Sequence, residues 1–219
     1  MTDEYQIRLG AEDLQYLVFR SLFQNLNEYI DEEETRGQTL DDYFNQLTGR
    51  SLKKIKLERV HPNNFHLGHR PSLIEAPVDE WPAVAVMTFS SAGDRYEGTD
   101  RADANVMTLS IECIVKSDPF KIGADGLVLA NGDDPEEQVD RRIKRTAEAI
   151  HKTMARHRDM NGEVVPTDRP PSVTWGDVFI RDAQVGKDSE IGRYFWQGVR
   201  FQYTYLSDSY FDILDQEIT

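Results

Sequence analysis

Residues Asn105 to Lys116 alternate strictly between two sets of side chains, and no other feature of the 219-residue chain constrains the fold as strongly. The more apolar set comprises Met107, Leu109, Ile111, Cys113 and Val115. The other set comprises Val106, Thr108, Ser110 and Glu112. Because successive side chains of a strand point to opposite faces, this period of two predicts a strand that buries one face.

A second strand is predicted just before this one, over Ala83 to Phe89. The segment between them, Ser90 to Asp103, is rich in Gly, Asp and Ser, which favour turns. It holds no pattern for a crossover helix, so a parallel pair is excluded. We therefore expect an antiparallel hairpin with an extended tip.

A second hairpin is predicted from Val173 to Ala183 and Arg193 to Leu206, around a turn at Gly186 to Gly192. In its second strand one face is predicted to meet the core, with Phe195, Val199, Phe201, Tyr203 and Tyr205. The alternate residues Arg200, Gln202 and Thr204 are expected to meet water.

Helical periodicity is clear in two long segments. Apolar residues recur at helical spacing from Ala11 to Ile30, and the acidic run Asp31 to Glu34 followed by Gly37 is expected to end this helix. A short second helix is predicted from Leu40 to Gly49, packing on the core or on a neighbouring subunit. The next helix begins at Pro135 after a cap at Asp133 or Asp134, and its inward stripe is Val139, Ile143, Ala147, Ile150 and Met154.

The order of the main elements is thus helix, hairpin, helix, hairpin. This order predicts an α+β fold in which an antiparallel sheet of four strands carries the helices on one face. We expect a single domain over residues 1–219, with its core in about 11–30 and 83–206. An inserted arm or loop is expected over about 31–82, and an acidic C-terminal tail over 207–219.

The charge balance argues against general binding to nucleic acid. The chain has 39 acidic and 25 basic residues, a formal net charge of −14, so phosphates would be repelled. The start of the chain lacks a secretory or transit signal, and no apolar run is long enough to span a membrane, so a cytoplasm is expected. The single cysteine, Cys113, is interpreted as a core residue.

The segment from Arg50 to Pro82 is predicted to be a long loop. It carries a basic patch, Arg50, Lys53, Lys54, Lys56 and Arg59, for which contact with an acidic protein surface is at least as good an interpretation as contact with DNA. The histidines His61, His66 and His69, completed by Glu75, have ligand types that would suit a metal. The favoured interpretation is that they pack against prolines, with Trp81 anchoring the loop.

No arrangement for catalysis is predicted, and the chain is expected not to be an enzyme and to hold no cofactor or metal. Gly123 to Gly126 is not followed by the residues of a phosphate-binding loop. Asp133 and Asp134 are explained as a helix cap rather than as a general acid and base.

One loop is predicted to contact another subunit. Between Asp118 and Asp134 lies an apolar group of residues flanked by glycines: Ile122, Leu127, Val128 and Leu129. Exposed apolar loops usually need a partner, so these four residues are the candidate subunit-contact loop.

The element order, the long loop after Lys116 and the closing strand from Arg193 to Tyr205 together resemble the tail terminator proteins of long-tailed bacteriophages. The resemblance covers roughly Ala11 to Ile30 and Ala83 to Leu206, and it implies an antiparallel sheet backed by helices. It further implies a ring of six copies that caps the tail tube and joins it to neck or connector proteins. Such a protein assembles in the host bacterial cytoplasm and resides in the virion, and DNA passes its lumen without specific binding.

Three other functions stay open at the level of sequence. The first is another neck or head-completion connector protein of the same virion. The others are a small enzyme with a metal in the histidine loop and a ligand-binding α+β domain.

Overall fold

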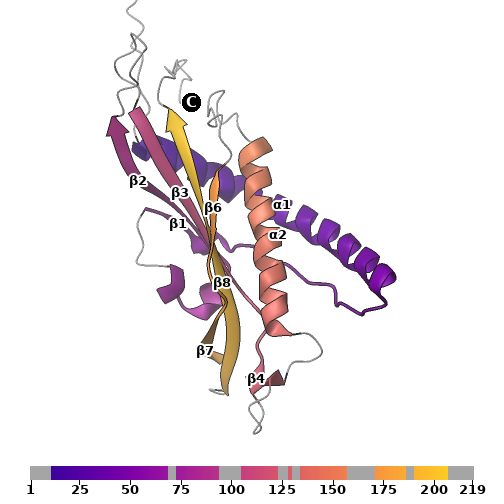
Figure 1. Ribbon diagram of the computed structural model, residues 1–219. Helices are drawn as coiled ribbons and strands as arrows, with labels where there is room; N and C mark the ends of the chain where they lie inside the picture. Colours follow the sequence, from indigo (N-terminus) through magenta and orange to yellow (C-terminus); the bar gives the residue numbers. More distant parts are fainter. Residues whose placement is uncertain are drawn as a thin grey trace, which may run out of the picture.

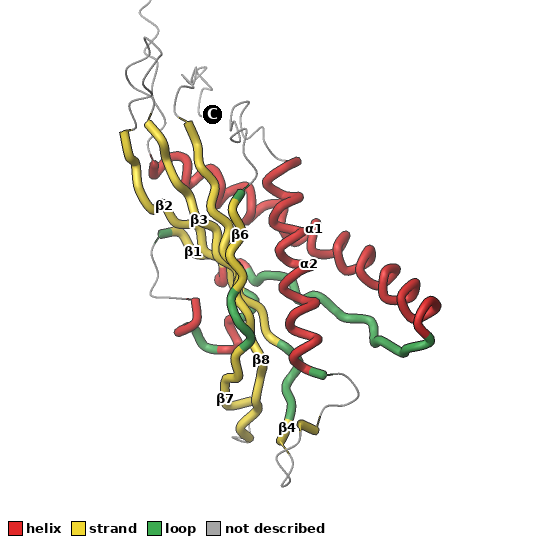
Figure 2. The backbone as a smooth tube through the Cα atoms, in the orientation of Figure 1, coloured by secondary structure: helices red, strands yellow, loops and turns green. Residues whose placement is uncertain are grey.

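The computed structural model describes residues 11–68, 73–93, 105–122, 128–129, 134–156, 171–185 and 190–206 (Figures 1 and 2). Its helices and strands are α1 (Ala11–Thr48), β1 (Phe65–Leu67), β2 (Ala83–Gly93), β3 (Asn105–Lys116), β4 (Lys121–Ile122), β5 (Val128–Leu129), α2 (Pro135–Arg156), β6 (Ser172–Trp175), β7 (Phe179–Val185) and β8 (Glu190–Leu206). The α+β class is confirmed. No helix within these ranges is long and apolar enough to cross a membrane.

The first helix, α1, is one continuous helix of 38 residues, so the prediction of two helices separated near Gly37 was wrong. The acidic run that was expected to end the helix instead meets cations of α2. Glu33 is fully buried and pairs with Lys152. Gly37 faces the Arg145 guanidinium, which donates to the Gly37 carbonyl oxygen at 3.0 Å. These contacts stabilise the helix where its own sequence predicts an end.

The main sheet has six strands in a mixed arrangement, in the order β1-β2-β3-β8-β6, with β7 also paired to β8. The predicted antiparallel sheet of four strands, and the order helix, hairpin, helix, hairpin, were wrong. The extra strand β1 comes from the segment that was predicted to be a loop, and it pairs with β2 in parallel. Being only three residues long, it gives no periodicity that a sequence pattern would reveal.

The first hairpin is confirmed: β2 and β3 pair antiparallel up to Gly93 and Asn105. Residues 90–93 of the predicted tip belong to β2, and the rest of the tip, 94–103, lies outside the described residues. The alternation of β3 is confirmed as well, because Leu109, Ile111 and Cys113 are all buried in the core between sheet and helices. On the other side of the same strand, Ile114 packs in a separate cluster with Trp196 and Trp81.

The single strand predicted from Val173 to Ala183 is two strands, β6 and β7, both paired antiparallel with β8. They are separated at Gly176, whose amide donates to the Gly198 carbonyl oxygen at 2.8 Å. A Cβ atom at position 176 would lie 3.1 Å from that oxygen, so the close approach of the two backbones depends on glycine at position 176.

The second helix begins as predicted, with Asp134 as its cap. The Asp134 carboxylate accepts from the Glu136 amide at 3.0 Å, and Val139, Ile143 and Ile150 are fully buried. Both helices pack on the same face of the sheet (Figure 1), where their apolar residues share one core with β2, β3 and β8.

The sequence of α2 places three acid–base pairs four residues apart: Glu137 with Arg141, Asp140 with Lys144 and Glu148 with Lys152. Of these, only Asp140 with Lys144 is formed in the described structure, at 2.6 Å. Arg141 pairs with Asp41 of α1 at 2.5 Å, and Lys152 pairs with Glu33. The cations of α2 therefore hold the two helices together.

The chain between α1 and β1 runs back along both helices. Ile55, Leu57 and Val60 are buried in the main core. Backbone amides of this segment are held by α1 side chains: Leu57 donates to the Glu34 carboxylate at 2.7 Å, and Val60 to the Asn27 side chain at 2.9 Å. This path of the chain places the basic patch alongside α2.

Candidate functional site

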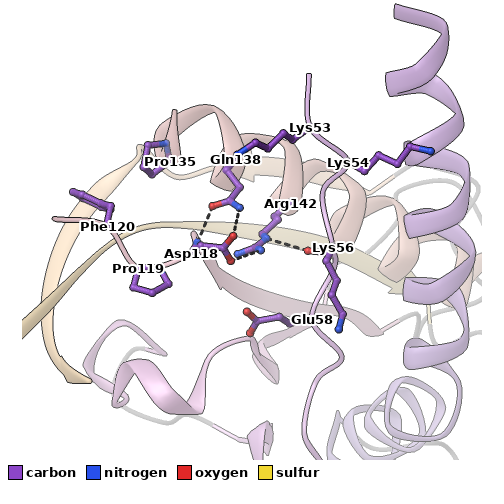
Figure 3. A pocket seen from close by; sticks show the side chains of 10 residues that line it. All are labelled: Lys53, Lys54, Lys56, Glu58, Asp118, Pro119, Phe120, Pro135, Gln138 and Arg142. Carbon is purple, nitrogen blue, oxygen red and sulfur yellow. Dashed lines mark hydrogen bonds and ion pairs between the residues drawn. The ribbon is translucent and has the colours of Figure 1, made fainter. Parts of the chain in front are cut away.

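A groove of about 560 Å³ lies where the segment after α1, the turn after β3 and the start of α2 meet (Figure 3). Its lining combines cations, two carboxylates, an amide and apolar rings: Lys53, Lys54, Lys56, Glu58, Asp118, Pro119, Phe120, Pro135, Gln138 and Arg142. We call this feature the basic groove.

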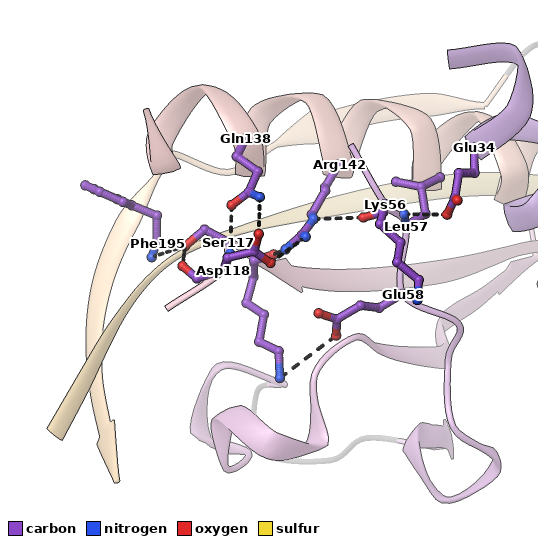
Figure 4. Close-up of polar contacts among 10 residues, drawn as sticks. Glu34, Lys56, Leu57, Glu58, Ser117, Asp118, Gln138, Arg142 and Phe195 are labelled. Carbon is purple, nitrogen blue, oxygen red and sulfur yellow. Dashed lines mark hydrogen bonds and ion pairs between the residues drawn. The ribbon is translucent and has the colours of Figure 1, made fainter. Parts of the chain in front are cut away.

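Arg142 organises the floor of the basic groove (Figure 4). Its guanidinium donates to the Lys56 carbonyl oxygen at 3.1 Å, the Lys116 carbonyl oxygen at 2.8 Å and the Asp118 carboxylate at 2.7 Å. Gln138 completes the arrangement, because its side chain accepts from the Asp118 amide at 2.7 Å and donates to the Asp118 carboxylate at 2.6 Å. One buried cation thus ties together α2, the end of β3 and the basic segment.

Asp118 is held as a carboxylate in this network. Partial burial raises the pKa of Asp118, but hydrogen bonds from Arg142 and Gln138 and the charges of Arg142 and Lys53 outweigh it, so the pKa is lowered overall. A general acid or base needs a pKa near the working pH, whereas this carboxylate stays ionised. The network is therefore suited to structure and to electrostatic recognition rather than to proton transfer.

The rim of the basic groove carries the lysines of the predicted basic patch. Lys54 pairs with Asp42 of α1 at 2.8 Å. The Lys56 side chain is exposed, and within the described part of the chain its ammonium has no ion-pair partner. Of the two acidic residues of the lining, Asp118 pairs with Arg142 in the floor of the groove, and Glu58 pairs with Lys116 at 4.0 Å. The rim therefore presents positive charge in a chain that is acidic overall.

In the described part of the chain, apolar side chains are also exposed in two other places that bear on assembly. The first, which we call the sheet-edge surface, is the exposed edge of β6 and β7, where four large side chains have exposed fractions of 40 to 51%: Val173, Trp175, Phe179 and Ile180. Phe179 and Ile180 are consecutive in β7, so they lie on opposite faces of this edge. These strands form one edge of the main sheet. Beside them is a hollow of about 250 Å³, whose lining includes Ile114, Trp175 and Trp196.

The hollow exists because position 198 has no side chain. Gly198 pairs in register with Ile114, and a Cβ atom added there would meet only the Cys113 carbonyl oxygen, at 3.6 Å. Phe179 stacks on Trp196 at the rim, with 4.8 Å between ring centroids. An apolar side chain of another molecule would find both space and aromatic contacts in this hollow.

The second apolar surface is the last part of α1, and we call it the helix-end surface. It comprises four residues at helical spacing with exposed fractions of 38 to 66%: Leu40, Tyr43, Phe44 and Leu47. They share one face of the helix. The sequence left open whether this segment packs on the core or on a neighbouring subunit, and in the structure these side chains do not join the core.

The predicted subunit-contact loop is only partly visible. The backbones of Ile122, Val128 and Leu129 belong to the small ladder β4-β5, in which Ile122 pairs with Val128. Leu127 lies outside the described residues, as do the surroundings of the other three side chains. Its role as a contact stays a prediction.

The histidines of the sequence are placed in different structures. His61 caps a short 3-10 turn, its ring accepting from the Asn63 amide at 3.2 Å, and His66 lies in β1. His69 is outside the described residues, and Glu75 is exposed in another 3-10 turn. In the described ranges no three His, Cys, Asp or Glu side chains are grouped to hold a metal.

Sequence reasoning missed the Asp118–Arg142 pair and the sheet-edge surface. Arg142 lies one residue before the apolar stripe position Ile143 and appeared to be an ordinary helix cation. The one available signal was the concentration of Trp, Phe and Ile on both sides of Gly176, more apolar than an edge strand requires.

Comparison of the chain with protein-family models gives no match, and comparison with the curated proteins gives none either.

Proposed function

We propose that this chain is a structural subunit of virion assembly, a tail terminator that forms a ring on the end of a phage tail tube. The observation that carries the proposal is the presence of two separate exposed apolar surfaces on one subunit, the sheet-edge surface and the helix-end surface. A closed ring is built from head-to-tail interfaces, and each such interface joins two different surfaces of the subunit.

Both surfaces have the character of protein contacts. Single exposed apolar residues are common, but groups of four large ones surrounded by polar residues mark interaction sites. The end of α1 extends past α2 and away from the sheet (Figure 2), so the two surfaces point to different neighbours. A two-fold dimer in which one surface meets its own copy would leave the other surface exposed.

The resemblance of the sequence to tail terminators is the reason for proposing this particular ring, the one at the end of a phage tail tube. An α+β subunit with its helices on one face of a sheet is compatible with that family at a coarse level, although the observed topology differs from the expected one. By this proposal six copies cap the tube and bind neck or connector proteins. The net charge of −14 suits a lumen through which DNA passes without sticking.

Another connector protein of the neck is the nearest alternative, since it would use the same two surfaces. A ligand-binding domain has one observation in its favour: the basic groove, at about 560 Å³, has the volume of a small-molecule site. Its floor is already filled by the mutual bonds of Arg142, Asp118 and Gln138, which favours a structural reading.

Mixing two surface variants tests the head-to-tail arrangement. The first carries Tyr43→Asp and Leu47→Asp, and the second carries Trp175→Asp and Ile180→Asp. Each alone is expected to be monomeric by light scattering, because each lacks one half of every interface. Mixed in equal amounts, they are expected to form a heterodimer through the one intact pair of surfaces.

The matched control is Tyr16→Asp, which changes an exposed aromatic residue of α1 outside both surfaces and should leave the ring intact. A mixture that stays monomeric while wild-type chain forms rings would show that these surfaces do not contact each other. A wild-type chain that never assembles would contradict the proposed ring itself.

A further inference from the structure

The basic groove combines charge and apolar contact in a way that the ring proposal does not use. Lys53, Lys54 and Lys56 line its rim, while Pro119 and Phe120 form an apolar wall opposite them (Figure 3). A segment that alternates carboxylates and apolar side chains would pair its carboxylates with the lysines and pack its apolar side chains on the wall. General nucleic-acid binding is a poorer fit, because the whole chain is strongly acidic.

Such a segment is present in this chain, beyond the end of β8. Residues 207–219 carry four carboxylates, on Asp208, Asp212, Asp215 and Glu217, and no Lys, Arg or His. Four apolar residues lie between these acids, Tyr210, Phe211, Ile213 and Leu214, and Ile218 follows the last acid. The composition of this acidic segment is therefore complementary to the basic groove in charge and in apolar content.

The segment cannot easily reach the groove of its own subunit. The Ser117 amide, next to Asp118 in the groove, bonds to the Phe195 carbonyl oxygen of β8, whereas β8 ends at Leu206. Eleven residues of strand separate these points, which is about 36 Å at 3.3 Å per residue. To return, the chain would need a similar length of fully extended backbone, so Asp208, Asp212 and Asp215 fall short.

We infer that the basic groove binds the acidic segment 207–219 of a neighbouring copy of this chain. The inference rests on the proposed ring, in which different ends of adjacent subunits meet, and it adds an electrostatic contact to the apolar ones. The lysine rim attracts the carboxylates, and the Phe120 wall receives the apolar residues between them. Arg142 acts as a positioning residue, because it holds the basic segment against α2 through the Lys56 carbonyl oxygen.

Disulfide crosslinking between two full-length variants tests this contact. One variant carries Lys56→Cys and the other Asp215→Cys; the native Cys113 is buried and does not interfere. The two are mixed, one of them labelled with nitrogen-15, and oxidised mildly. We expect a covalent dimer on a non-reducing gel, with mass spectrometry showing a disulfide between position 56 of one chain and position 215 of the other.

Two controls make the result specific. Thr39→Cys, on an exposed part of α1 outside the groove, replaces Lys56→Cys and should give no product with Asp215→Cys. Adding Lys53→Glu and Lys54→Glu to the groove variant should remove most of the crosslinked dimer. Adding Asp212→Lys and Glu217→Lys to the partner should then restore it.

Three outcomes would overturn the inference. In the first, rings form but positions 56 and 215 do not crosslink, and the ring proposal survives. In the second, a chain carrying both cysteines forms the disulfide only within one isotopically uniform molecule, which would place the segment on its own subunit. A chain that stays monomeric and gives no crosslink would contradict both the inference and the proposed function.

Discussion

Arg142 is the single residue on which most of the groove depends. It is 5% exposed, and its guanidinium binds the Lys56 carbonyl oxygen in the basic segment and, at the end of β3, the Lys116 carbonyl oxygen and the Asp118 carboxylate. Arg142→Ala is expected to lower the free energy of unfolding by roughly 3 kcal/mol, since it leaves buried acceptors unpaired. Urea denaturation measures this loss.

The matched control is Lys144→Ala, on the same helix, whose exposed pair with Asp140 is expected to contribute less than about 0.5 kcal/mol. Equal effects of the two substitutions would show that Arg142 is an ordinary surface cation.

Glu33 gives stability a dependence on pH. Burial raises the pKa of Glu33, but bonds and charge from Lys152 and Arg36 outweigh it, so the folded pKa lies below the ordinary 4.5. A lowered folded pKa stabilises the protein above the unfolded value, and this contribution is lost as the pH falls through the folded pKa.

We therefore expect the urea concentration at the unfolding midpoint to decrease as the pH falls below about 4.5. The substitution Glu33→Gln is expected to remove part of this pH dependence and to destabilise the protein at pH 7. Denaturation curves at several pH values test this. A pH profile unchanged by Glu33→Gln would contradict the ion pair.

Cys113 is predicted to be chemically silent in the folded protein. It is 1% exposed, and burial raises the pKa of its thiol to about 12. Because the thiolate is the reactive form, a thiol-modifying reagent should react only on unfolding. If the thiol of Cys113 were modified in native buffer nearly as fast as in urea, the strand β3 would have to open readily.

At the level of elements, the contact between α1 and α2 is concentrated at Gly37. A Cβ atom there would lie 2.3 Å from Arg145 Nε, although alanine is otherwise favoured over glycine in a helix. Gly37→Ala should thus be destabilising in the wild-type chain, because Arg145 must leave its bonds to the Gly37 carbonyl oxygen and to Asp41.

In an Arg145→Ala background the same substitution should be stabilising, by roughly 0.5–1 kcal/mol. A double-mutant cycle of unfolding free energies measures this change of sign. The same sign in both backgrounds would mean that Gly37 and Arg145 do not compete for space.

The elements predicted correctly from the sequence are those whose own pattern determines them. The strand from Asn105 to Lys116 and the helix from Pro135 carry full periodicity and, for the helix, a cap. The end predicted for the first helix was wrong because Glu33 and Gly37 are accommodated by α2, a tertiary effect that local sequence does not contain. The division at Gly176 depends on its contact with Gly198, which lies on another strand, so the residues around Gly176 do not predict it.

The candidate sites, too, were predicted only where neighbouring residues in the sequence determine them. The lysines of the basic groove were visible as a patch because they are neighbours in the sequence. Their partners Asp118 and Arg142 are separated by 24 positions, and only the fold brings them together. The apolar residues of α1 from Leu40 to Leu47 were recognised by their spacing, but their exposure depends on how far the helix extends past α2.

On the scale of the whole molecule, one subunit carries three surfaces suited to contacts: the sheet-edge surface, the helix-end surface and the basic groove. Two are apolar and differ from each other, which is the requirement for head-to-tail assembly. The third adds charge, so the assembly is expected to weaken but not to vanish at high salt, because salt screens the ionic contact alone.

The most direct test is the mass of the purified wild-type chain by light scattering, with negative-stain electron microscopy of the same sample. We expect closed rings with a mass of about six subunits, at low and at high salt. A strict two-fold dimer, or a monomer that forms no rings even on isolated tail tubes, would contradict it.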